Sequence, residues 1–126
     1  MFSYLTLGAH DLAASHAFYD PVLKTVGLER LKFDQRELGY GPPGGAVWLW
    51  VVKPENLRPA SYGNGTMLAL AAPGRAAVDA FHAAAMANGG YDEGQPGLRD
   101  YSPTWYACYV RDPAGNKLSA VYNKPV

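Results

Sequence analysis

The strongest constraint on the fold of this chain is an order of expected elements that occurs twice: one strand, one helix, then three strands. Residues 66–71, 105–111 and 116–122 show the apolar patterns of strands in the second half, and residues 75–88 show helical spacing. Residues 91–93 are expected to start a further strand, followed by a Gly/Pro-rich loop over 94–103. The first half gives a helix over 12–26 and strands over 2–9, 28–33, 35–40 and 46–52.

This duplication predicts an α+β fold of two βαβββ modules. The modules are expected at about residues 2–53 and about 65–124, within a single domain of residues 1–126. Each helix can cover only one face of a sheet, so the other face needs a ligand or a second subunit. We therefore expect a curved mixed sheet with both helices on its convex face.

Local signals support the boundaries of the first helix and of the last turn. Asp11 occupies the position of a helix N-cap, where a carboxylate accepts from the exposed N–H groups of the first turn. Pro21 removes one backbone donor and predicts a kinked or divided helix, and Gly27 is a plausible stop. The run Asp112-Pro113-Ala114-Gly115 is typical of a turn between two strands.

Composition bears mainly on location and on the kinds of partner. The 11 basic and 11 acidic residues balance, so nothing indicates nucleic-acid binding. No apolar run approaches the roughly 20 residues of a membrane-spanning helix, and the first residues lack the pattern of a secretory signal. Cys108 is the single cysteine, which excludes a disulfide within the chain, favours a cytoplasmic location and predicts a buried, inert thiol.

Aromatic residues make up 13% of the chain and concentrate in the expected strands. In the strand over 46–52, Val47, Leu49 and Val51 are expected to face the helix, which leaves Trp48 and Trp50 on the other face. There the two indoles either wall a pocket for a flat ligand or a cation or pack against a dimer partner or a core.

Several motifs across nearly the whole chain resemble one family. They are residues 4–12 followed by Phe18-Tyr19, the Gly63-Asn64-Gly65-Thr66 segment, and Asp112-Pro113-Ala114-Gly115-Asn116-Lys117-Leu118, which is similar to an Asp-Pro-Asp-Gly-Asn turn. With the duplicated element order, they resemble the vicinal oxygen chelate superfamily, which includes glyoxalases, bleomycin resistance proteins and extradiol dioxygenases. The resemblance implies a U-shaped eight-stranded sheet, completed by dimerisation, with a pocket on its concave face.

Many members of that superfamily bind a divalent metal through His, Glu or Gln from four strands, but this chain departs from the pattern. The corresponding positions hold Tyr4, Trp48 or Trp50, Met67 and Ser119, none of which is an imidazole or a carboxylate. The histidines are expected elsewhere, with His10 in a turn and His16 and His82 on helices. We therefore expect neither a metal site nor another cofactor.

These observations predict a metal-free protein of the bleomycin-resistance type that binds a small apolar or aromatic molecule and forms a homodimer. The alternatives are a metal-dependent glyoxalase-like lyase or dioxygenase, and an interaction module with a filled pocket. Catalysis therefore stays open, with the site composition favouring binding alone. Arg99, Asp100 and Tyr101 lie in a long loop that could close over a ligand or stay solvated. The expected ligand-binding residues are Tyr4, Trp48, Trp50, Met67, Trp105 and Ser119.

Overall fold

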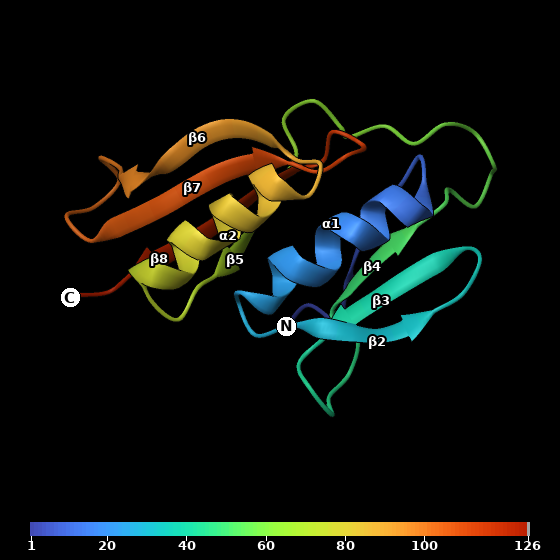
Figure 1. The fold of residues 1–126 in the computed structure, drawn as a ribbon, viewed down its shortest axis with the longest axis horizontal. Helices are drawn as coiled ribbons and strands as arrows, with labels where there is room; N and C mark the ends of the chain where they lie inside the picture. Colours follow the sequence, from blue (N-terminus) through green and yellow to red (C-terminus); the bar gives the residue numbers. More distant parts are fainter. Residues whose placement is uncertain (126) are drawn as a thin grey trace.

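A computed structural model describes residues 1–125, so Val126, the last residue of the expected domain, lies outside the described part. The eight strands form two four-stranded mixed sheets, and each sheet carries one helix. Figure 1 shows the two helices side by side on one face of the molecule, each in front of its own sheet. The duplicated α+β architecture expected from the sequence is confirmed.

The first module contains β1 (Leu5–Gly8), α1 (Leu12–Lys24), β2 (Glu29–Phe33), β3 (Glu37–Gly41) and β4 (Leu49–Val52). Its strands lie in the order β1-β4-β3-β2, so the first strand pairs in parallel with the last. The crossover through α1 allows this parallel pairing, because parallel strands cannot be joined by a tight hairpin.

The second module repeats this plan with β5 (Met67–Ala71), α2 (Arg75–Ala87), β6 (Tyr91–Leu98), β7 (Trp105–Arg111) and β8 (Lys117–Asn123). Its strands lie in the order β5-β8-β7-β6, with β5 and β8 parallel. None of the helices in residues 1–125 is long and apolar enough to cross a membrane.

The first helix begins as expected but is not divided. Asp11 accepts hydrogen bonds from the backbone N–H groups of Ala13 and Ala14. Pro21 lies inside a continuous helix that ends at Lys24, so the expected division at this proline is wrong. The carbonyl of Ala17, four residues earlier, loses its usual donor. Because Ala17 is exposed, water can satisfy that carbonyl.

Besides the first strand, which spans Leu5–Gly8 and not residues 2–9, three strand expectations need correction. Asp34 accepts from the N–H groups of Arg36 and Glu37, which forms a turn and delays β3 to Glu37. Strand β4 starts only at Leu49, so alternation does not extend back to Val47. A Cβ added at Gly39 would lie 2.8 Å from the Trp50 ring and 3.0 Å from the Val47 side chain. Val47 therefore lies on the same side as Trp50, not toward the helix.

The third correction concerns residues 94–98, which were expected in a loop. They continue strand β6 to Leu98, paired with β7. Pairing shifts register between Asp92 and Gly94 and again between Gly94 and Gly97. Glycine and proline are therefore accommodated at irregularities of the ladder, as is common at β-bulges on an edge strand.

A buried polar cluster joins the two modules. Asp112, just after β7, is fully buried and accepts a hydrogen bond from the Tyr19 hydroxyl of α1 at 2.5 Å. Asn116 donates from its side chain to Asp112 and to the carbonyl of Gly8, both at 2.8 Å. The expected turn thus also bonds the second module to the first. Burial, together with the Asp112 charge, raises the pKa of Tyr19 well above its ordinary value.

Candidate functional site

The helix-free face of the second sheet is defined by strand alternation. Cys108 and Val110 of β7 and Leu118 and Ala120 of β8 belong to the core beneath α2. Because successive side chains point to opposite faces, the alternate residues of both strands lie on the helix-free face. These residues are Trp105, Ala107, Tyr109 and Arg111 of β7, and Lys117, Ser119, Val121 and Asn123 of β8.

A cavity of about 790 Å³ opens on this face. Its size falls within the range of pockets that hold small organic ligands. Met67 and Trp105, two of the expected site residues, both line it. The full lining is Met67, Glu93, Gly94, Arg99, Tyr101, Trp105, Tyr109 and Lys117.

Two basic side chains lie against the Tyr109 ring in this cavity. The guanidinium carbon of Arg99 is 5.3 Å and the ammonium nitrogen of Lys117 is 5.7 Å from the ring centroid. Arg99 lies along β6, since a Cβ at Gly94 or Gly97 would be only 3.2 Å from its terminal nitrogens. The two glycines therefore make room for the guanidinium.

The acidic residue of the cavity is already paired. Glu93 accepts from the Nε of Arg111 at 2.5 Å, and this hydrogen bond lowers the pKa of the Glu93 carboxyl. Within residues 1–125, neither Arg99 nor Lys117 has a carboxylate within 4.0 Å. The cavity therefore has two basic side chains without a carboxylate partner.

Two buried donors on this face also lack hydrogen-bond partners among the described residues. They are the indole Nε1 of Trp105 and the hydroxyl of Ser119. Ser119 is fully buried and is paired with Tyr109 across the ladder. The Trp105 ring is held by an edge contact with Tyr101, with centroids 5.3 Å apart. Both donor atoms are covered by protein and Ser119 is not part of the cavity lining, so these donors are not exposed to the cavity.

The other expected site residues lie elsewhere. Tyr4 and Trp48 line a second cavity of about 260 Å³ that also includes Leu68–Ala71 of β5. Tyr4 is 58% and Trp48 54% exposed, so the cavity leaves much of both rings in solvent. Trp50 lies over Gly39. The expected group of six residues is thus divided between the two modules.

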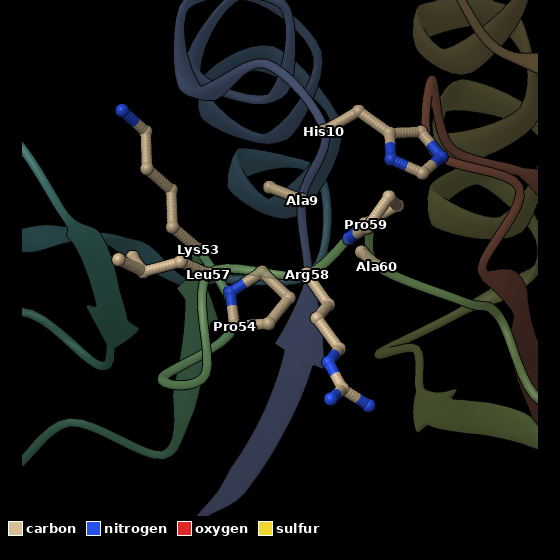
Figure 2. Close-up of a pocket in the computed structure, with 8 residues that line it drawn as sticks. All are labelled: Ala9, His10, Lys53, Pro54, Leu57, Arg58, Pro59 and Ala60. Carbon is tan, nitrogen blue, oxygen red and sulfur yellow. The ribbon is translucent and has the colours of Figure 1, made fainter.

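A third cavity, of about 340 Å³, lies where the connection after β4 passes the start of α1. Figure 2 shows its basic residues Lys53, Arg58 and His10 extending in three different directions. Leu57 has a φ of 62°, which is unusual for a branched residue. Because the basic groups diverge, they form no common binding point for an anion.

Cys108 and His82 both lie where helix α2 contacts the second sheet. Cys108 faces α2, where its thiol lies 3.6 Å from the carbonyl of Val78, and burial raises its pKa to about 11. His82 is buried on α2 and contacts Asp92 at 2.8 Å. This contact is the main cause of the lowered pKa of Asp92. The expectation of a buried thiol is confirmed.

The residues at the expected metal positions do not fit a divalent cation. Phenol, indole, thioether and hydroxyl groups replace the imidazoles and carboxylates that such ions prefer. Throughout residues 1–125, His, Cys, Asp and Glu side chains nowhere gather in a group of three or more that could hold a metal.

Two βαβββ modules, each with a parallel first and last strand, define a paired-module α+β protein. A glyoxalase/bleomycin resistance protein from Albidiferax ferrireducens is 40% identical in sequence. The match covers 99% of each chain, with a TM-score of 0.87. The chain belongs to the glyoxalase/bleomycin resistance protein family, and its resemblance to the vicinal oxygen chelate superfamily is confirmed.

More distant solved structures share the fold. A glyoxalase-related enzyme from Fulvimarina pelagi has 22% identity and a TM-score of 0.75, covering 98% of this chain and 88% of that one. A lactoylglutathione lyase from Agrobacterium tumefaciens has 24% identity and a TM-score of 0.65, covering 96% and 92%. No family model matches the sequence, and no curated protein matches it either.

Proposed function

We propose that this protein binds a small apolar or aromatic molecule, without a metal ion, in the cavity on the helix-free face of the second sheet. The observation that supports this most directly is the aromatic wall of Trp105, Tyr101 and Tyr109. Aromatic walls with a few polar groups are typical of ligand pockets. A cytoplasmic location, favoured by the single cysteine, remains part of this proposal.

Tryptophan fluorescence tests the location of binding because the three tryptophans lie in different places. In a Trp48→Phe, Trp50→Phe double variant, Trp105 is the single reporter, and we expect an aromatic fragment library to contain compounds that quench or shift its emission. The Trp105→Phe variant should bind the same compounds about tenfold more weakly, because part of the apolar contact of the indole is lost. Calorimetry supplies affinities that do not depend on the reporter.

Two results would count against this proposal. The first is that no compound of the library perturbs Trp105. The second is that the Trp48→Phe, Trp50→Phe variant loses affinity while Trp105→Phe retains it, which would move the site to the first module. Nickel, zinc and iron titrations of chelator-treated protein form a separate arm. Stoichiometric tight binding would favour the metal-dependent alternative.

We also propose that the chain forms a homodimer, as the superfamily resemblance implies. Phe2, Tyr4 and Trp48 are all more than half exposed near the start of β1, and large apolar side chains of this kind favour burial against a second copy. Sedimentation equilibrium of the full chain should give twice the monomer mass. A Tyr4→Ser, Trp48→Ser variant should shift the equilibrium toward the monomer, whereas a monomeric wild-type protein at micromolar concentration would contradict this proposal.

A further inference from the structure

We infer that the ligand of the second-module cavity is an aromatic carboxylate whose negative charge is bound by Arg99 and Lys117 beside the Tyr109 ring. This inference rests on the proposed binding function and adds the charge of the ligand. Its basis is the coincidence, in one cavity, of an aromatic wall and two basic groups without a carboxylate within 4.0 Å among the described residues.

The charges of the cavity-lining residues favour an anionic ligand over a cationic one. An aromatic ring attracts a cation to its face, but the Tyr109 ring already has Arg99 and Lys117 against it. Glu93, the carboxylate of this cavity, is paired with Arg111. A cationic ligand would therefore meet two like charges, whereas an anion would meet Arg99 and Lys117, neither of which has a carboxylate within 4.0 Å among residues 1–125.

Arg99 has donors left for a ligand. It donates to the backbone carbonyls of Gln95 at 2.6 Å and Leu98 at 3.3 Å, which fixes the plane of the guanidinium. A guanidinium has five N–H donors, so these two contacts leave three. Because Gly94 and Gly97 make room for it, the group is held on the sheet and not extended into solvent. A fixed fork of this kind suits the two oxygens of a carboxylate.

The remaining lining indicates that the anion carries an aromatic body. Trp105 and Tyr101 contact each other edge to face, and Met67 lies on the same cavity wall. A free inorganic anion would leave these apolar surfaces without contact, while a planar ring would bury them.

Calorimetry on the full chain tests the inference with four probes: naphthoate, naphthamide, naphthylmethylammonium and inorganic phosphate. Naphthoate should bind at least tenfold more tightly than the neutral amide, and the ammonium compound should bind most weakly. Raising the ionic strength from about 0.05 to about 0.5 M should weaken naphthoate binding and leave naphthamide unaffected.

Matched variants locate the charge effect. Lys117→Gln and Arg99→Gln should each weaken naphthoate binding about tenfold while leaving naphthamide binding unchanged. Lys117 makes no side-chain hydrogen bond within residues 1–125, so its variant should fold even if Arg99→Gln loosens the loop after β6. The control is Lys53→Gln, Arg58→Gln, which removes two basic groups from a different cavity and should leave naphthoate affinity unchanged.

Each contrary result has a distinct meaning. Equal affinity for naphthoate and naphthamide would overturn the inferred charge and leave the proposed binding function intact. Phosphate binding as tight as naphthoate binding would overturn the aromatic part. Loss of affinity in the Lys53→Gln, Arg58→Gln control would overturn the location. Failure of all four probes, with no neutral fragment binding either, would overturn both the inference and the proposed function.

Discussion

Replacing Asp112 with alanine is expected to lower the free energy of unfolding by about 3 kcal/mol or more. Each buried donor left without its acceptor costs roughly 1–3 kcal/mol, and the change affects several. Asp112 accepts from the Tyr19 hydroxyl, from the side chain of Asn116, and from the backbone N–H groups of Ala114 and Asn116. All of these contacts are buried, so water cannot replace the carboxylate without opening the contact between the modules.

Urea denaturation followed by circular dichroism measures this effect, and two variants bracket it. Tyr19→Phe removes one of the four hydrogen bonds and should cost about 1.5 kcal/mol. Glu55→Ala removes an exposed carboxylate in the connection after β4 and should change stability by less than about 0.5 kcal/mol. If Asp112→Ala were no more destabilising than Glu55→Ala, the polar cluster would have no role in joining the modules.

The Gly90→Ala substitution should have the second large effect, a loss of about 2–4 kcal/mol. A Cβ at this position would lie 2.7 Å from the Phe18 ring of α1, 2.8 Å from the carbonyl oxygen of Ala85 and 3.0 Å from that of Arg111. Two of these three atoms belong to the backbone and cannot move alone. The Ala85 carbonyl also accepts from the N–H of Gly90 at 2.8 Å, so relief of the clash would break that bond.

The matched control is Gly74→Ala, at the N-terminus of α2. Gly74 has an extended backbone and no neighbour within 4 Å of an added Cβ, so this variant should lose only about 0.5–1 kcal/mol, the difference between glycine and alanine at a helix N-cap. In thermal denaturation, Gly90→Ala should have a clearly lower melting temperature than Gly74→Ala. Similar melting temperatures would show that α1 and the segment after α2 adjust easily to each other.

Much of this fold could be predicted from the sequence because its signals are local. The Asp11 cap and the alternation in residues 105–111 depend on close neighbours, and both are confirmed. The sequence pattern does not predict a strand over residues 94–98, because glycine and proline usually end a strand. Here the neighbouring strand β7 holds them in register between two irregularities. Pairing with a distant segment outweighed local propensity.

The candidate site was less accessible to sequence reasoning. Met67 and Trp105 line one cavity, but Tyr4 and Trp48 line another, because the first two belong to the second sheet and the other two directly precede β1 and β4 of the first sheet. The sequence does not single out Tyr109 or Lys117 as site residues, although Tyr109 lies four positions from Trp105 and Lys117 two positions from Ser119, on the same strand faces. Arg99 was left open between a ligand contact and a solvated loop. Its place over Gly94 and Gly97 depends on the bulged path of β6.

The contact between Tyr19 and Asp112 has a consequence for how the chain folds as it is synthesised. All four strands of the first sheet have been translated once Val52 is made, so that sheet can close early. The acceptor for Tyr19 is translated 60 residues later, the difference between positions 112 and 52. Until Asp112 has been synthesised, the Tyr19 hydroxyl must be hydrated on the nascent first module. It becomes buried only when the second module packs against the first.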